Sequence, residues 1–337
     1  MTAAPAFDLG NAEWLAHRYV ESTDAFRFIH VPRSDHAQHS FLIDAALGPR
    51  PTAPDLPANT LLAQPRGRLH FLFHSAFCGS TLLARALSEP GVAMGLSEPV
   101  VLNDVVGFRR RGAQPAQVAR AADLALRLLG RPFGPGEAMI VKPSNVVNPL
   151  AELLMAIEGQ AQALFLFAPL ETFLISVARK GLHCRTWVRE LLEGYLRERF
   201  VDLGLAAEDY FRLTDLQVAA VGWLAQHQFF AHLAGKVGGR LASLDADRMT
   251  ADPEAALAAV AAHYGLGLDA AAAAAGPAFR RNSKTGQAYS PQDRSADYTA
   301  ARAAYGEEIA MVMTWAEAVA ANVGLGLTGP NPLLGQA

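Results

Sequence analysis

The sequence is poor in cysteine, in net charge and in long hydrophobic runs. Cys78 and Cys184 are the only cysteines among 337 residues. Two are too few for a disulfide framework, and they agree with a reducing compartment such as the cytoplasm. The 29 Lys and Arg side chains nearly balance the 32 Asp and Glu side chains, which leaves a net charge of −3. The chain is therefore no general binder of polyanions, and a phosphate or sulfate site needs a local basic cluster.

No stretch offers about 20 uninterrupted apolar residues, so we expect no membrane span. The first eight residues, MTAAPAFD, lack the basic start and apolar run of a secretory signal. With 51% hydrophobic and 18% charged residues, the composition excludes intrinsic disorder. We expect a globular, cytoplasmic protein with a sizeable core. Abundant Ala and Arg with little Lys are compatible with a GC-rich bacterial genome.

Proline is concentrated in residues 49–67, which contain Pro51, Pro54, Pro57 and Pro65. This density is typical of a linker. Residues 1–60 are then a lid, an arm or a small appended unit, and the pattern does not choose among these. Residues 61–330 are predicted to form the main domain.

From residue 69, short apolar runs alternate with helical repeats. Strands are predicted at residues 69–73, 92–96, 137–141, 163–167 and 241–244. Helices are predicted at residues 82–87, 115–129, 149–157, 170–180, 186–203, 211–235, 253–264 and 296–323. The alternation implies crossover connections, and the strands are apolar on both faces. The pattern predicts an α/β three-layer sandwich with a central parallel sheet flanked by helices.

A loop of small residues follows the first of these strands and reads HSAFCGSTLL from His74. Backbone N–H groups at a helix N-terminus attract an anion, and Gly79 lets the backbone approach it closely. Ser80 and Thr81 can cap the helix or donate to phosphate oxygens. The triphosphatase pattern GxxxxGK[ST] fails, because His74 replaces its first Gly and Ser80 its Lys. The loop alone fits an anion site or an ordinary capped helix.

The loop resembles the 5′-phosphosulfate loop of the P-loop sulfotransferases, Ser-Gly-Thr-Thr-Leu-Leu, with CGSTLL in its place from Cys78. Three further segments follow in the family's order. Residues 97–99 (SEP) resemble the Glu-containing segment of the bacterial and protein-tyrosine members, and residues 140–145 (IVKPSN) are similar to Lys-Thr-Pro-x-Asn. Residues 241–253 resemble the family's RYEDL…DP segment, and a basic, Gly-containing loop follows at residues 280–286. The resemblance covers about residues 66–323.

The resemblance implies a P-loop-type fold and transfer of a sulfuryl group from 3′-phosphoadenosine 5′-phosphosulfate to a hydroxyl or amine. Glu98 is then the general base, and His74 and Lys142 are the nearest cations to the loop. The residues implied to bind the cofactor are Cys78, Gly79, Ser80, Thr81, Leu82, Ser176, Arg179, Arg280, Arg281, Lys284 and Gly286. The acceptor, a small molecule or a peptide, is not encoded in any pattern that we can identify.

Two positions depart from the family. Phe77 stands where the family has Lys or Arg, and Ala168 stands where it has Arg at the end of the 3′-phosphate strand. Sulfuryl transfer depends on neutralising developing charge, as phosphoryl transfer does. Substitutes must therefore come from elsewhere. The candidates are His74, Arg85 and Lys142 near the loop, and Arg179 and Lys180 near the 3′-phosphate.

Other interpretations stay open. The chain could be a kinase or other nucleotide-dependent enzyme that uses the same loop, or a non-catalytic binding protein. Glu98 could simply favour a helix start, Ser176 could be a buried helix serine, and the loop at residues 280–286 could be solvated. Asp35, His36 and His39 lack the spacing of a zinc site, so no metal is predicted. No interleaving of aromatic and basic residues indicates nucleic acid, and the oligomeric state is open, with a homo-oligomer among the options.

Overall fold

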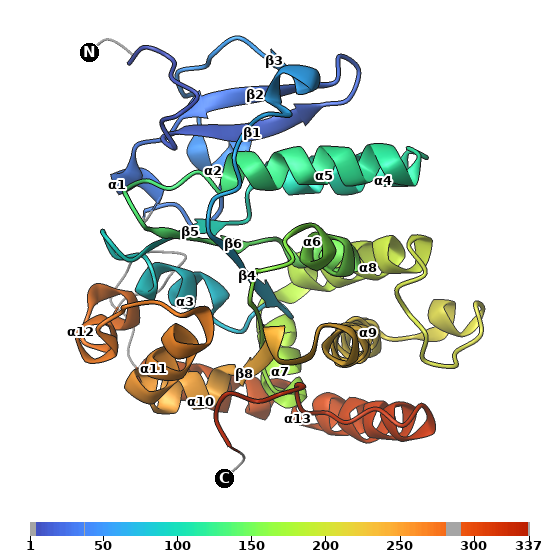
Figure 1. Ribbon diagram of the computed structural model, residues 1–337. Coiled ribbons are helices and arrows are strands. Elements are labelled where there is room, and N and C mark those ends of the chain that lie inside the picture. Colours follow the sequence, from blue (N-terminus) through green and yellow to red (C-terminus); the bar gives the residue numbers. More distant parts are fainter. Residues whose placement is uncertain (1–4, 37, 281–290, 336–337) are drawn as a thin grey trace.

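The computed structural model describes residues 5–36, 38–280 and 291–335 (Figure 1). Its centre is a five-stranded sheet in which every neighbouring pair is parallel. In spatial order the strands are β5 (Ala93–Ser97), β6 (Ala138–Lys142), β4 (Leu69–His74), β7 (Ala163–Phe167) and β8 (Leu241–Asp245). All five strands predicted in this part of the chain are present. The predicted parallel α/β sheet is confirmed.

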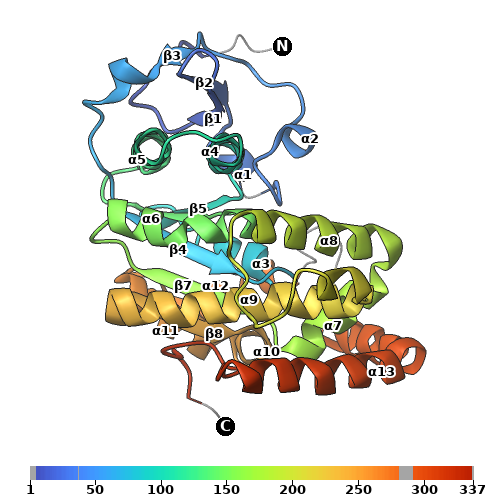
Figure 2. The same ribbon diagram turned by 90° about the vertical axis from the view of Figure 1, so that its right-hand side faces the viewer.

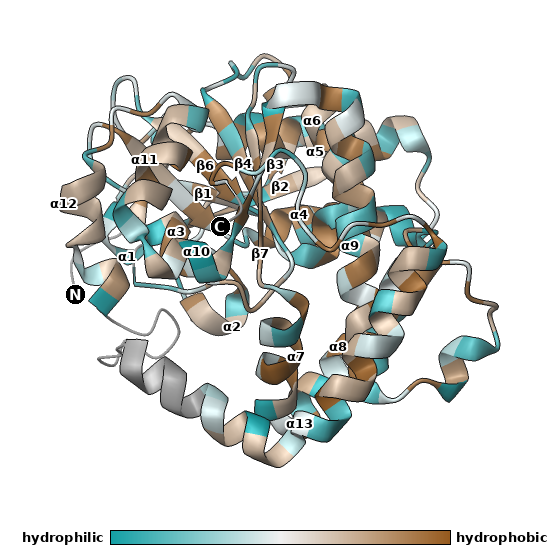
Figure 3. Ribbon diagram, turned by 90° about the horizontal axis from the view of Figure 1, so that it is seen from below, coloured by the Kyte–Doolittle hydropathy of each residue, from teal (hydrophilic) through white to brown (hydrophobic). Residues whose placement is uncertain are grey.

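Helices cover both faces of this sheet, which explains why its strands are almost wholly buried. One face carries α3 (Ser80–Ala86), α11 (Pro253–Tyr264) and α12 (Ala270–Ala274); the other carries α6 (Ala151–Ile157), α8 (Gly181–Arg197) and α9 (Asp215–Val237) (Figures 1 and 2). Coloured by hydropathy, the central strands are mostly brown, whereas teal segments gather on the outer helices (Figure 3). The hydrophobic core therefore lies between the layers.

The direction of winding of the sheet reverses beside the end of β4. The chain leaves β4 toward β5 on one side and later passes from β6 to β7 on the other side. In open parallel sheets, ligands bind at the carboxyl ends of strands where the direction of winding reverses. Here that point lies between β4 and β7, so the loop after His74 and the residues after Phe167 meet there.

Residues 5–61 contain a second, antiparallel sheet of β1 (Trp14–Val20), β2 (Ala25–His30) and β3 (Leu56–Pro57). It packs through β1 on α4 (Val100–Arg110) and α5 (Pro115–Leu129) (Figure 1). Ion pairs join the parts: Arg18 Nε lies 2.9 Å from Asp104 Oδ2, and Arg120 Nη1 lies 2.8 Å from Asp24 Oδ2. The part of the chain from residue 5 to residue 61 is thus tied to α4 and α5 by packing and by ion pairs. The sequence pattern had identified none of its strands.

Several boundaries differ from prediction. No element was predicted at α4. Its valines at positions 100, 101, 105 and 106 favour strands intrinsically. The segment is helical because a helix buries Val101, Leu102, Val105 and Val106 on one face. The helix predicted at residues 149–157 begins as the 3₁₀ helix η2 (Asn145–Leu150) and continues as α6. Helix α8 begins five residues before the predicted start at residue 186.

The other α-helices of the described residues are α1 (Arg33–His36), α2 (Asp44–Leu47), α7 (Leu170–Arg179), α10 (Ala246–Ala251) and α13 (Pro291–Asn322). The other 3₁₀ helices are η1 (Ala58–Leu61), η3 (Asp209–Arg212), η4 (Gly238–Arg240) and η5 (Pro277–Arg280). Within the described ranges, no helix has the length and apolar character that crossing a membrane requires.

Candidate functional site

The loop between β4 and α3 has an unusual backbone. Ala76, Phe77 and Gly79 have φ angles of +72°, +52° and +77°. A side chain makes the left-handed region unfavourable, so two non-glycine residues there hold strain. Such strain persists where the surrounding structure enforces it, and it is concentrated at binding sites. Turns of this kind direct N–H groups into a common concavity that suits an anion.

Hydrogen bonds to neighbouring strands hold the loop in place. The Ala76 N–H donates to His74 Nδ1 at 3.1 Å, and the Ser75 N–H donates to the Leu166 carbonyl at 3.1 Å. Ser80 and Thr81, at the start of α3, are buried at 7% and 5% exposure. Cys78 is also buried, and desolvation raises the pKa of its thiol. That thiol stays protonated near neutral pH and is a poor nucleophile.

Three of the residues singled out in the sequence, His74, Glu98 and Lys142, come together at the ends of β4, β5 and β6. Lys142 Nζ donates to Glu98 Oε1 at 2.6 Å, and His74 Nε2 lies 3.6 Å from the same oxygen. Because His74 Nδ1 accepts the Ala76 N–H, the neutral ring carries its proton on Nε2, facing Glu98. One carboxylate thus faces two basic side chains directly beside the loop.

Glu98 is the accessible member of this cluster. Its side chain is 19% exposed, whereas those of His74 and Lys142 are 5% and 0% exposed. Its backbone is left-handed, with φ at +52°, and its N–H donates to the Lys142 carbonyl at 2.7 Å. Of the three side chains, solvent therefore reaches Glu98 most readily.

Residues 41–42, from the N-terminal part of the chain, also contact the cluster of His74, Glu98 and Lys142. The Leu42 N–H donates to the Ser97 carbonyl at 2.8 Å, and the Leu42 carbonyl accepts the Val100 N–H at 3.2 Å, so Leu42 bridges the two sides of Glu98. The neighbouring Phe41 ring centre lies 5.7 Å from Lys142 Nζ. Residues 41–42 therefore border the candidate site, a role that no pattern in the sequence indicated.

A cation also lies against the loop at the position of Phe77. The Phe77 ring packs against the rings of Phe173 and Trp187, with centroids 5.8 and 5.5 Å away. Lys180 Nζ lies 4.3 Å from the centre of the Phe77 ring, a cation–π distance. The positive charge of Lys180, at the end of α7, thus lies beside Phe77, which carries no charge itself.

The position of Ala168 has no room for an arginine. Ala168 is fully buried between the loop and α9: its N–H donates to Ser75 Oγ at 3.4 Å, and its carbonyl accepts the Trp223 indole N–H at 2.9 Å. The packing around Ala168 therefore excludes an arginine side chain at this position. Two of the cations named as substitutes, Arg179 and Lys180, lie exposed at the C-terminal end of α7. The same helix carries the buried Ser176.

Arg280 is the one residue of the predicted basic loop at residues 280–286 that the structure describes. Arg280 is exposed at the end of η5, and η5 packs against α3, the helix that begins at Ser80. Arg281, Lys284 and Gly286 lie outside the described residues. Leu82 lies in the first turn of α3 and is partly buried.

Asn145, three residues after Lys142, was quoted in the sequence motif but given no role. It is 3% exposed, and within the described part of the chain its Nδ2 has no hydrogen-bond partner. A buried amide without a partner is costly, so it is a candidate donor to a bound molecule. The amide of Asn148, in contrast, is used internally, because its Nδ2 donates to the His74 carbonyl at 3.2 Å.

The Asp35, His36 and His39 segment is engaged in other contacts. Arg50 pairs with Asp35 and lies 2.9 Å from His39 Nε2, and His36 is packed on the Phe133 ring. Within the ranges that the structure describes, no group of three or more His, Cys, Asp or Glu side chains has the arrangement of a metal site.

Comparisons with known proteins add little to this geometry. No family model matches the sequence, and no curated protein matches it significantly. The sulfotransferase domain from the curacin biosynthetic pathway aligns at 13% identity and a TM-score of 0.41, over 79% of this chain and 100% of that one. The sulfotransferase domain from the Synechococcus PCC 7002 olefin synthase aligns at 13% identity and a TM-score of 0.38, over 70% and 85%. Similarity this low decides nothing about activity, whereas the strand order of this chain itself defines the α/β class.

Proposed function

We propose that this chain binds 3′-phosphoadenosine 5′-phosphosulfate and transfers the sulfuryl group to a hydroxyl or amine of a small-molecule or peptide acceptor. The principal support is the arrangement of Glu98. Its carboxylate is paired with the buried Lys142 at 2.6 Å and is still partly open to solvent, directly beside the loop after β4. An anion-binding loop and an accessible carboxylate at the same sheet edge are what a proton-coupled transfer to a hydroxyl requires.

The loop fits the anionic part of such a cofactor. Three left-handed residues shape its backbone, Ser80 and Thr81 add hydroxyl groups, and Lys180 adds a positive charge next to Phe77. Bound there, the cofactor would supply the sulfuryl group. The loop amides would bind its 5′ end, and Lys180 would stabilise the charge that develops as the group is transferred.

On the acceptor side, Glu98 takes the proton from the attacking hydroxyl or amine. Lys142 is a positioning residue, because its fully buried ammonium holds Glu98 Oε1 and does not reach solvent. His74 lies at the end of β4, and its Nε2 is 3.6 Å from the same carboxylate oxygen, so it is a neighbouring group for the proton that Glu98 receives. Residues 41–42 border the acceptor side.

The 3′-phosphate is assigned to Ser176 and Arg179 of α7 and to Arg280, which its helix brings against α3. Arg281, Lys284 and Gly286 are proposed to complete this site as the sequence resemblance implies. Cys78 and Leu82 take part through their backbone, since the Cys78 side chain is buried.

The first test is a calorimetric titration with adenosine 3′,5′-bisphosphate, the product nucleotide, alongside ATP with Mg²⁺. We expect saturable binding of the bisphosphate and weaker binding of ATP. A ligand present at 100 times its dissociation constant stabilises the folded state by about 2.7 kcal/mol, so thermal shift provides a second readout. No binding of the bisphosphate at millimolar concentration would refute the proposal, and preferential binding of ATP with Mg²⁺ would favour a kinase-type enzyme.

Phe77 and Ala168 favour one second candidate, a non-catalytic binding protein with the same fold, because two cofactor-facing cations of the family are absent. A transfer assay with the radiolabelled phosphosulfate and panels of phenols, alcohols, amines and tyrosine peptides distinguishes the two. Bisphosphate binding without transfer to any of these acceptors would support the second candidate.

A further inference from the structure

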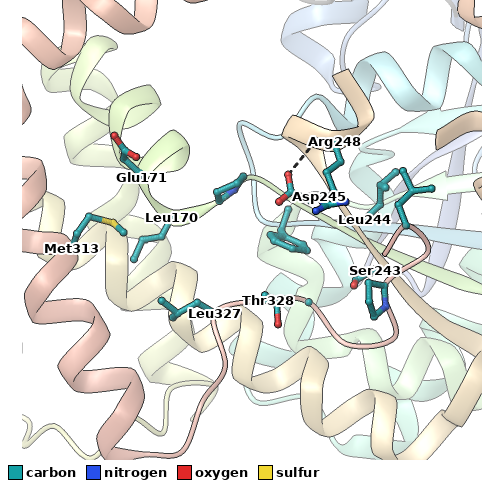
Figure 4. Close-up of a pocket in the computed structure, with 14 residues that line it drawn as sticks. Leu170, Glu171, Ser243, Leu244, Asp245, Arg248, Met313, Leu327 and Thr328 are labelled. Carbon is teal, nitrogen blue, oxygen red and sulfur yellow. Dashed lines mark hydrogen bonds between the residues drawn. The ribbon is translucent and has the colours of Figure 1, made fainter. Parts of the chain in front are cut away.

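A cavity of about 430 Å³ opens at the outer edge of the central sheet, where β7 and β8 end (Figure 4). Its volume lies in the range of small-molecule sites. None of residues 74–81 lines it, so it is separate from the loop site. Its apolar lining includes Phe167, Leu170, Leu244, Met313, Leu327 and Leu334.

One side of this cavity is mostly apolar and the other mostly polar. In Figure 4, Leu170, Met313 and Leu327 lie on one side together with Glu171, and Ser243, Asp245 and Arg248 lie on the other together with Leu244. Such a division suits an amphipathic molecule, whose charged end and apolar body need different surroundings.

Ser243 provides the clearest sign of a missing ligand. It is 1% exposed, and its Oγ has no hydrogen-bond partner among the residues that the structure describes. A hydroxyl buried in this way costs free energy unless another group bonds to it. A ligand oxygen in the cavity would satisfy it.

Two further features attract a negative charge. Arg248 lines the cavity, and so do Pro169, Leu170 and Glu171, the N-cap and first residues of the ten-residue helix α7. Pro169 provides no side-chain cap, so the first turn of α7 presents backbone N–H groups and the positive end of the helix dipole.

The two carboxylates at the cavity are compensated by other groups. Asp245 caps α10, accepting the Asp247 N–H at 2.7 Å and the Arg248 N–H at 3.4 Å. Glu171 Oε1 accepts from Arg302 Nε at 2.9 Å. Glu171 is thus paired with a cation, and Asp245 is held by the backbone of α10.

The C-terminal segment forms a fixed wall of the cavity. The Ser243 N–H donates to the Asn331 carbonyl at 3.1 Å, and the Leu333 N–H donates to the Ser243 carbonyl at 2.9 Å, which extends the sheet beyond β8. At Gly329, an added Cβ would lie 2.5 Å from Ser243 Oγ and 2.6 Å from the Phe167 ring, so the close approach requires glycine. The wall is thus ordered rather than a loose tail.

We propose that this cavity binds a small amphipathic carboxylate, with its anionic head at Ser243 and Arg248. Its hydrocarbon chain lies along Leu170, Met313 and Leu327. The proposal shares no residue with the sulfuryl-transfer site, so the two can fail separately.

The test is a calorimetric titration with sodium octanoate, compared with 1-octanol and octylamine, which share its chain but not its head group. The variant Met313→Trp fills the cavity, and Met311→Trp is the matched control, because Met311 lies on the same helix and is 68% exposed. We expect saturable octanoate binding to the wild type and to Met311→Trp, and at least tenfold weaker binding to Met313→Trp. Octanol and octylamine should also bind at least tenfold more weakly than octanoate.

Arg248→Gln and Ser243→Ala test the head group and also serve if Met313→Trp does not fold. Each should weaken octanoate binding about tenfold, as expected for a lost hydrogen bond to a charged group, and leave adenosine 3′,5′-bisphosphate binding unchanged. Absence of saturable octanoate binding at millimolar concentration, or equal affinity in Met313→Trp and Met311→Trp, would overturn the proposal. Octylamine binding as tightly as octanoate would contradict an anion site.

Discussion

Lys180 holds its ammonium 4.3 Å from the centre of the Phe77 ring, although the two residues lie more than 100 positions apart in the sequence. The contact places a positive charge against a loop whose own sequence has no Lys or Arg between His74 and Leu83. The proposed anion site therefore has a cation beside it, despite the phenyl group at position 77.

Replacing Lys180 should weaken nucleotide binding. We expect Lys180→Met to lower the affinity for adenosine 3′,5′-bisphosphate about tenfold or more, because a charge near the anion is lost. The matched control is Lys236→Met, since Lys236 is an exposed lysine that pairs with Glu152 at 2.8 Å on another helix. Phe77→Lys in the Lys180→Met background should restore part of the affinity. Calorimetry measures all four proteins, and equal affinities throughout would remove Lys180 from the site.

Removing the carboxylate should abolish transfer and also strain the fold. Glu98→Gln leaves the buried Lys142 ammonium without its counter-ion, and we expect a loss of about 2–3 kcal/mol in the free energy of unfolding, somewhat below the cost for a fully buried pair. Urea denaturation measures this cost. The double variant Glu98→Gln/Lys142→Met should lose less than the sum of the single variants, because the stranded charge is gone.

The role of Glu98 in sulfuryl transfer is tested separately from its role in stability, with a variant that keeps the charge. Glu98→Asp keeps the negative charge but withdraws it by one methylene, so we expect it to bind bisphosphate as the wild type does while its transfer rate falls by a factor of about 10² or more. A variant that binds the bisphosphate normally and transfers at the wild-type rate would show that Glu98 is not the base.

Introducing an arginine at position 168, where the sulfotransferase motif has one, should destabilise the protein. Ala168 is fully buried between Ser75 and Trp223, so Ala168→Arg introduces excess volume and an unpaired charge. We expect a cost of about 3 kcal/mol or more, or failure to fold. Lys at position 77 should be tolerated by comparison, because Phe77 is partly exposed. A fully stable Ala168→Arg with improved bisphosphate binding would contradict the packing argument.

Mild acid should destabilise the protein through its buried histidines. Desolvation lowers the pKa of His36 and of His70 to about 4 and that of His227 to about 3, from 6.5. Below pH 6.5 the unfolded chain therefore binds protons that the folded chain does not, and stability falls as the pH drops toward 4. Each such histidine contributes a slope of up to about 1.4 kcal/mol per pH unit. Urea denaturation between pH 7 and pH 4 measures the slope, and His36→Phe should reduce it by about one histidine's share.

Much of the fold could be predicted from local patterns. The apolar runs at residues 69–73 and 163–167 became β4 and β7 because strands buried on both faces need continuous hydrophobic sequence. Helix α4 could not be predicted, since its valines take their structure from the surfaces on which they pack. Strands β1 and β2 (WLAHRYV and AFRFIH) could not be predicted either, because basic side chains interrupt their apolar residues. The loop after β4 was visible as small residues between a strand and a helix.

The sequence by itself determined the parallel α/β class and the loop at residues 75–79, because these depend on periodicity and on residue types close together in the chain. Glu98 and Lys142 became candidates through the resemblance of residues 97–99 and 140–145 to sulfotransferase segments. Only the tertiary structure decided that Lys142 is buried against Glu98, that Lys180 stands over Phe77 and that Ala168 leaves no space for a larger side chain. The physical reason is that charge pairing and steric exclusion depend on distances between residues far apart along the chain, and such distances exist only once the helices have packed on the sheet.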